Sequence, residues 1–246
     1  MPIGHAMAPP APRSRIERVT TADRAAPRPT SAPVGPGRAR RNARGQATRE
    51  LMLVTAERLF AERGIGAVPL RDIAVAAGAR NNVAVQYHFG DREALVRAVA
   101  AHRAAFVDDV QAELLAESLA TGQPPRPIDH VRLFVESLAA NITDDDNHYI
   151  PFLSRYLIER GGYAGLFDTV PATTVLTLRA LLRHLLSDLD PATIQERWEI
   201  VMGTTVHTLA RYQRALAAGT LHAPLDDLIE DLVHFLGAGL ASPAEG

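Results

Sequence analysis

The sequence predicts an all-α fold in two parts, a three-helix helix-turn-helix domain followed by a larger helical domain. From residue 46 onward, apolar residues recur mainly at i, i+3, i+4 and i+7, the spacing of one helix face. Segments that alternate strictly between apolar and polar residues, which would predict strands, are nearly absent. Glycines and prolines divide the chain into pieces of helical length. With 246 residues, 47% of them apolar, the chain can build a sizeable core.

Residues 1–45 are predicted to form a disordered tail. They are rich in Pro, Ala, Arg and Ser, and they hold too few large apolar residues to offset the entropy of ordering. Nine arginines stand against two acidic residues, so this tail carries +7 while the whole chain carries −2. Two interpretations stay open: a solvated leader without a task, or a flexible arm on DNA. The arm would use Arg38, Arg40, Arg41 and Arg44 on phosphates or in the minor groove.

Residues 46–92 hold three helix patterns in succession. The first ends at Gly64, a residue suited to a left-handed helix end. The second begins at Pro69 and ends at Gly78, and its apolar positions are Leu70, Ile73, Ala74 and Ala77. The third lies in the stretch ARNNVAVQYHFGDREALV, residues 79–96, where Val85 and Phe89 can face the core.

This arrangement is typical of a helix-turn-helix, whose second short helix can enter the major groove of DNA. Asn and Gln can pair bidentately with adenine, and Arg can pair with guanine. Side chains of these types lie within two turns, at Arg80, Asn81, Asn82 and Gln86. Just beyond them, Tyr87, His88 and Arg92 are suited to phosphate oxygens. The sequence therefore predicts a nucleic-acid interface on the third helix.

Residues 48–96 closely resemble the DNA-binding domain of the TetR family of bacterial transcriptional regulators. The matching pieces are TRELMLVTAERLFAERG, VPLRDIAVAAG and YHFGDREAL. The resemblance implies an all-helical dimer that represses, less often activates, by binding a palindromic operator. It also implies release of the operator when a small molecule binds the C-terminal domain. Between Gly78 and the YHF triplet this sequence holds one residue more than the family usually has, so base contacts carry over only to within one position.

The resemblance adds one residue of the first helix to the expected interface. Thr48 matches a common phosphate-contact position, although a threonine there can also be only a helix cap. For His88 the alternative is a hydrogen-bonded histidine at the edge of the domain. The residues expected to contact DNA are Thr48, Arg80, Asn81, Asn82, Val83, Ala84, Gln86, Tyr87, His88 and Arg92.

Residues 93–240 are predicted to form the second domain, for which the resemblance implies ligand binding and dimerisation. Asp91 is expected to cap a long helix that runs to about Leu119. Further helices are predicted over residues 128–141, 148–160, 170–189, 191–218 and 225–237. The run DDDNH, residues 144–148, lacks the spacing and the glycine of a calcium loop and predicts a solvated connection.

The last two predicted helices carry regular apolar stripes. According to the resemblance they meet their symmetry mates in a four-helix interface. Alternatively each stripe faces its own core, because periodicity does not identify the partner. The residues expected in a dimer interface are Trp198, Thr205, Leu209, Tyr212, Leu228, Leu232 and Leu236.

A pocket for the small molecule is expected between helices, mostly apolar with a few polar groups. Its candidate lining residues, each of which can instead be plain core, are Tyr149, Phe152, Tyr156, Phe167, Trp198, Met202 and His207. The expected partners are operator DNA, an effector of unknown identity and a second copy of the chain.

Several classes of function find no support in the sequence. The chain has no cysteine, which excludes disulfides, thiolate metal sites and cysteine nucleophiles. Without a nucleophile elbow, a phosphate-binding glycine loop or a regular metal-ligand set, no catalytic residue, metal or cofactor is predicted. No long apolar run predicts a membrane span or a secretion signal, so we expect a cytoplasmic protein. The alternative function is a helical small-molecule-binding protein or enzyme that does not bind DNA.

Overall fold

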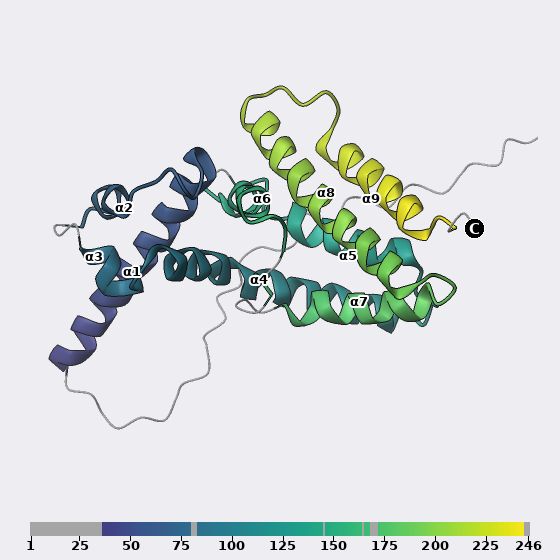
Figure 1. Ribbon diagram of the computed structural model, residues 1–246, viewed down its shortest axis with the longest axis horizontal. Coiled ribbons are helices and arrows are strands. Elements are labelled where there is room, and N and C mark those ends of the chain that lie inside the picture. The colour runs from purple at the N-terminus through teal and green to yellow at the C-terminus, as the bar shows by residue number, and fades with distance from the viewer. Residues whose placement is uncertain (1–35, 80–82, 145, 164, 168–171, 244–246) are drawn as a thin grey trace, which may run out of the picture. The chain divides into compact units, whose positions relative to one another are not determined.

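The computed structural model describes residues 36–79, 83–144, 146–163, 165–167 and 172–243, with side chains from residue 43 onward. These residues form nine α-helices and no strand, which confirms the predicted fold class (Figure 1). The helices are α1 (Pro36–Arg63), α2 (Leu70–Ala76), α3 (Ala84–Phe89), α4 (Arg92–Ala120), α5 (Pro127–Ala139), α6 (Tyr149–Arg160), α7 (Thr173–Leu185), α8 (Pro191–Ala217) and α9 (Leu225–Ala241). The part of the predicted tail before Pro36 lies outside the described residues, as do Arg80, Asn81 and Asn82.

The first three helices pack as the expected helix-turn-helix. α1 contacts α2, α2 contacts α3, and α4 closes the unit by contacting α1 and α3. Its core is apolar and almost fully buried, and it includes Met52, Phe60, Ile73, Val85, Leu95 and Val99. The connections need glycine where it was predicted, since Gly64 and Gly78 have φ of +92° and +68°, a region that other residues rarely adopt.

The predicted boundary between tail and domain at Gly45 is wrong. α1 begins at Pro36, so ten residues assigned to the tail continue the helix in the N-terminal direction. Six of its ten residues are arginine or alanine, which have high helix propensity, whereas Gly37 and Gly45 have low propensity. Extending a helix that tertiary packing already stabilises also avoids the cost of a new nucleus.

α4 links the helix-turn-helix to the remaining helices (Figure 1). The predicted cap is confirmed, since the Asp91 carboxylate accepts a hydrogen bond from Ala94 N at 2.7 Å. Of the helices that follow α4 in the chain, α5 packs most extensively on α9. α6 packs on α1 and α8, and α7 contacts α4, α5 and α8. α6 is therefore shared between the two parts of the fold.

The predicted bounds of the later helices hold to within four residues, and the two largest differences lie at C-terminal ends. α7 ends at Leu185 instead of Leu189. α9 runs to Ala241 instead of ending at Gly237. A Cβ atom at Gly237 would lie 2.7 Å from Ile128 Cγ1 on α5, so glycine is required there by the close packing of two helices. A glycine near the end of a helical pattern marked a packing contact here, and not a helix end.

The acidic run at residues 144–148 connects α5 to α6, and its buried residue Asn147 is hydrogen-bonded to Asn141 and to Tyr149 N.

Throughout the described ranges, no group of three or more His, Asp and Glu side chains is placed to hold a metal ion. Within the same ranges, every helix is too short or too polar to cross a membrane.

Candidate nucleic-acid interface and effector cavity

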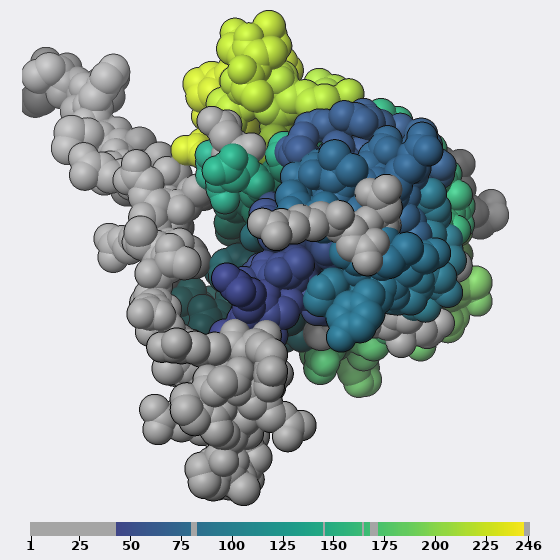
Figure 2. Space-filling view, turned by 90° about the vertical axis from the view of Figure 1, so that its left-hand side faces the viewer, coloured from purple at the N-terminus to yellow at the C-terminus, as the bar shows by residue number. Residues whose placement is uncertain are grey.

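α3 presents a polar surface that is anchored by a single buried residue. Val85 is 1% exposed and packs into the core of the helix-turn-helix. Gln86 and Tyr87 follow it on the outside, and Tyr87 is 86% exposed. His88 is half-buried, with its ring edge-on to that of Tyr87 at 5.2 Å between centroids. Figure 2 views the molecule from the side of the helix-turn-helix, whose surface is coloured purple to blue.

The remaining predicted contacts differ in their surroundings. Val83 is exposed and Ala84 is half-buried. Outside the described part of the chain lie Arg80, Asn81 and Asn82. Thr48 lies inside α1, where its hydroxyl donates to Arg44 O at 2.9 Å. The alternative of a helix cap is therefore wrong for Thr48, while its contact with phosphate stays a prediction.

Arg92 has a structural task that the sequence did not indicate. Its Nη1 donates to Ile65 O at 2.6 Å and to Val68 O at 2.7 Å. These carbonyls belong to the connection between α1 and α2, so Arg92 fixes that connection on the first turn of α4. These hydrogen bonds occupy Nη1 of the guanidinium, and the contact of Arg92 with phosphate stays a prediction.

The same connection is held from the other side by the C-terminal end of α6. Ile65 N and Gly66 N donate to Glu159 Oε1 and Oε2, both at 2.9 Å. A Cβ atom at Gly64 would lie 2.8 Å from Glu159 Oε1, so a larger residue there would have to displace the carboxylate from this position. Next to it, Arg160 Nη2 pairs with Glu93 Oε1 on α4 at 2.7 Å. We call this cluster around Glu159 the turn junction.

A second junction lies at the N-terminal end of α6 and is buried. Glu57, six residues before the end of α1, is 0% exposed. Its Oε2 accepts from Arg103 Nε on α4 at 3.3 Å, and its Oε1 accepts from His148 N, just before α6, at 3.1 Å. A buried carboxylate without such partners would be strongly destabilising. This buried junction therefore ties α1, α4 and the start of α6 together.

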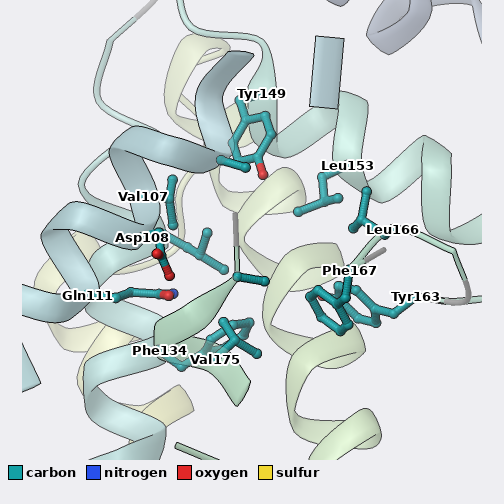
Figure 3. Close-up of a pocket in the computed structure, with 13 residues that line it drawn as sticks. Val107, Asp108, Gln111, Phe134, Tyr149, Leu153, Tyr163, Leu166, Phe167 and Val175 are labelled. Atoms are coloured by element: carbon teal, nitrogen blue, oxygen red, sulfur yellow. The ribbon is translucent and has the colours of Figure 1, made fainter. Parts of the chain in front are cut away.

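A small cavity of about 50 Å³ is lined by Ala104 and Tyr149, which follow the junction residues Arg103 and His148 in the chain. Figure 3 shows side chains that surround it. Its walls come from α4, α5, α6, α7 and the connection before α7, and most of them are apolar. The polar side chains among them are Asp108, Gln111, Tyr149 and Tyr163. Pockets for drug-sized ligands hold about 300–1,000 Å³, so a ligand of that size would have to displace side chains.

The predicted pocket residues separate into three groups. Tyr149 and Phe167 line the cavity. His207 is on the surface, where its Nδ1 shares a hydrogen bond with Ser154 Oγ at 2.8 Å. The others are buried in the core away from the cavity lining, as the alternative interpretation had it: Phe152, Tyr156, Trp198 and Met202.

Two family models match the chain over these same two parts. The model described as "Bacterial regulatory proteins, tetR family" matches residues 52–99, which span the helix-turn-helix and the start of α4. The model described as "Tetracyclin repressor-like, C-terminal domain" matches residues 132–239, from α5 to α9. The chain belongs to the TetR family. It is accordingly a DNA-binding transcriptional regulator. No curated protein was found to match its sequence.

The prediction that seven residues of α8 and α9 form a dimer interface needs correction. All seven are at most 8% exposed in the single subunit, so they have almost no surface to offer a partner: Trp198, Thr205, Leu209, Tyr212, Leu228, Leu232 and Leu236. The stripes face the subunit's own core, because periodicity reports that a face is buried and not what buries it. Large apolar residues that stay exposed on α8 and α9 include Ile200 and Phe235, at 54% and 72%.

Sequence reasoning also missed residues that organise this regulator. Glu57 lies four residues after Leu53 and three before Phe60, so an acid on the apolar stripe of α1 was a usable signal. Gln111 likewise follows Val107 by four residues and is 1% exposed. Glu159 gave no signal, since its partners are more than ninety residues away and its position is exposed.

Proposed function

We propose that this chain is a dimeric repressor that acts in the cytoplasm and releases a palindromic operator when a small molecule enters the cavity. The main support is the position of the cavity relative to the buried junction. Arg103 and His148 hold the Glu57 carboxylate, and the residues that follow each of them, Ala104 and Tyr149, line the cavity. A ligand that shifts either wall therefore acts on a contact to α1.

DNA binding would use α3 and the start of α1. Gln86 and Tyr87 are exposed in a helix that Val85 fixes to the core, which suits readout in the major groove. The first turns of α1 contain Arg38, Arg40, Arg41 and Arg44, and its first turn has no acidic residue. Positive charge at the positive end of a helix dipole is unfavourable unless an anion is near, and DNA phosphates would supply one.

The proposed switch passes through α6, which is held at both ends. Its N-terminal end adjoins the cavity and the buried junction, and its C-terminal end contributes Glu159 and Arg160 to the turn junction. A tenfold loss of operator affinity requires only about 1.4 kcal/mol of coupling free energy. A small displacement of α6 that weakens the turn junction is enough for such a change.

The dimer would form through the outer faces of α8 and α9. Exposed apolar side chains as large as Phe235 and Ile200 are typical of surfaces that a partner covers. A closed twofold pair would set the two α3 helices about 34–36 Å apart, one turn of DNA, or somewhat further on bent DNA.

DNA binding can be tested by fluorescence anisotropy with a labelled duplex from the region upstream of the gene. Gln86→Ala should weaken binding to this duplex at least fivefold more than binding to a scrambled duplex. Gln123→Ala makes the same chemical change on the exposed connection after α4 and should leave both unchanged. Folded protein that binds neither duplex at low salt would favour a helical small-molecule-binding protein or enzyme instead.

The dimer can be tested by light scattering coupled to size-exclusion chromatography. Phe235→Glu should shift the wild-type dimer to monomer, because it places a charge in the covered face. Phe106→Glu changes another exposed phenylalanine, on α4, and should leave the dimer intact. A wild-type monomer at micromolar concentration, or equal effects of the two variants, would contradict this part of the proposal.

A further inference from the structure

The polar groups of the cavity are mainly hydrogen-bond acceptors. Asp108 and Gln111 lie one turn apart on α4 and both line it (Figure 3). Gln111 Nε2 donates to Ser137 Oγ at 3.1 Å, which leaves the carbonyl oxygen of that amide for the cavity. Asp108 Oδ1 accepts from Thr174 N at 2.8 Å, and none of the ion pairs among the described residues includes Asp108. Among the described residues that line the cavity, none is Arg, Lys or His.

Hydrogen-bond donors in the lining are few. The Tyr163 hydroxyl donates to Met202 O at 3.2 Å, so its proton is directed away from a ligand. Burial raises the pKa of Tyr149, which therefore stays a neutral hydroxyl. A carboxylate or phosphate ligand would meet the charge of Asp108 with only neutral donors to compensate it, the Tyr149 hydroxyl and the second N–H of the Gln111 amide.

The opposite walls are aromatic and aliphatic. Tyr163 and Phe167 stack with 5.2 Å between ring centroids and 7° between planes, and Phe134 lies on α5. Ring faces attract cations as well as apolar groups, and both attractions grow where water is excluded. The cavity thus combines one carboxylate, free acceptors and aromatic faces.

We propose that the effector is a small amphipathic organic cation, whose protonated amine lies between Asp108 and the Gln111 carbonyl oxygen and whose apolar body packs on Phe134 and Phe167. This inference rests on the proposed role of the cavity as the effector site. It gives Asp108 a purpose beyond holding the first turn of α7. That structural purpose needs only one acceptor, which asparagine also provides.

The experiment uses the full-length chain and three probes of one shape: 2-naphthylmethylamine, 2-naphthylmethanol and 2-naphthoate, a cation, a neutral molecule and an anion at neutral pH. Isothermal titration calorimetry at fixed ionic strength should give an affinity for the amine at least tenfold above that for the alcohol. Asp108→Asn should remove this preference and leave the affinity for the alcohol unchanged. Asp109→Asn removes the same charge from the neighbouring exposed residue, and it should change neither the preference for the amine nor the affinity for the alcohol.

The inference is overturned if the alcohol or the acid binds the wild-type protein as tightly as the amine, if no probe binds, or if the two variants behave alike. Because the comparison among probes uses the wild-type chain, it holds even if Asp108→Asn folds poorly. Operator release, followed by anisotropy with the same probes, separates this inference from the proposed function. If only the alcohol or the acid releases the operator, the proposed regulator function stands and the inference of a cationic effector fails. If the amine binds at a site that depends on Asp108 but the protein never binds DNA, the cation site stands and the proposed regulator function fails.

Discussion

Replacing Glu57 by glutamine should destabilise the protein by about 2 kcal/mol, because the change removes the charge of the buried junction while keeping its shape. The new amide can still accept from His148 N, since Glu57 Oε1 holds that hydrogen bond at 3.1 Å. Its NH₂ group, however, meets the Nε–H of Arg103, which now donates to Oε2 at 3.3 Å. The variant therefore loses one charge-assisted hydrogen bond and places two donors face to face.

The magnitude follows from the burial of the two partners. Breaking a fully buried pair costs about 3–5 kcal/mol, and losing a hydrogen bond to a charged group costs about 1.5–3 kcal/mol. The Arg103 side chain is 28% exposed, so water recovers part of its hydration and the lower range applies. In a chain of this size, 2 kcal/mol corresponds to a fall in Tm of about 4–8 °C.

The assay is urea unfolding followed by circular dichroism, at one protein concentration because the stability of the proposed dimer depends on concentration. Glu62→Gln is the matched control: it removes the same charge from an exposed pair, Glu62 with Arg58, whose side chains are 43% and 42% exposed. Such a pair contributes about 0.5 kcal/mol or less. The double variant of Glu57→Gln with Arg103→Gln should destabilise less than the sum of its single variants. Equal effects of Glu57→Gln and Glu62→Gln, or strict additivity, would refute the role of the buried junction.

Three further predictions concern the contacts around α4, α5 and α6. Arg92→Ala should weaken operator binding without changing the slope of log K against log salt, because Arg92 holds backbone carbonyls; a slope reduced by about 0.9 would place it on a phosphate instead. Glu159→Gln should speed amide hydrogen exchange at Ile65 and Gly66, measured by mass spectrometry, and unchanged protection would contradict the turn junction. Burial lowers the pKa of His130, so the folded state loses stability as the pH falls from about 6.5, where the unfolded chain takes up the proton, toward the lower folded pKa. His130→Leu should flatten the dependence of the urea midpoint on pH between 7 and 5, and equal slopes in the two proteins would count against this cause.

The helices and most of their ends could be predicted because local chemistry determines them. Gly64, Gly78 and the Asp91 cap act within one turn of the backbone, so their effect can be deduced without knowing any tertiary contact. The start of α1 could not, since residues 36–45 are helical only as the extension of a packed helix. Gly237 misled for a similar reason, because its neighbour Ile128 lies more than one hundred residues away.

The candidate site was less predictable because it depends on which helices meet. A polar α3 follows from residue types alone, and Gln86 is exposed as the pattern required. The partners of Arg92 and Glu159, in contrast, are backbone groups of the α1–α2 connection. Backbone groups have no identity in a sequence, so no pattern of residue types can point to them.

The two ends of α6 differ in strength, and this difference indicates how the proposed switch would move. The buried junction centres on a fully buried carboxylate and costs about 2 kcal/mol or more to break, so it is suited to act as a pivot. At the other end, the Arg160–Glu93 pair is 34% and 51% exposed and contributes about 1 kcal/mol at most. The hydrogen bonds from Ile65 N and Gly66 N to Glu159 also lie near the surface. Since about 1.4 kcal/mol changes operator affinity tenfold, a ligand beside the pivot needs only to weaken the turn junction, and the helix-turn-helix can then shift without unfolding.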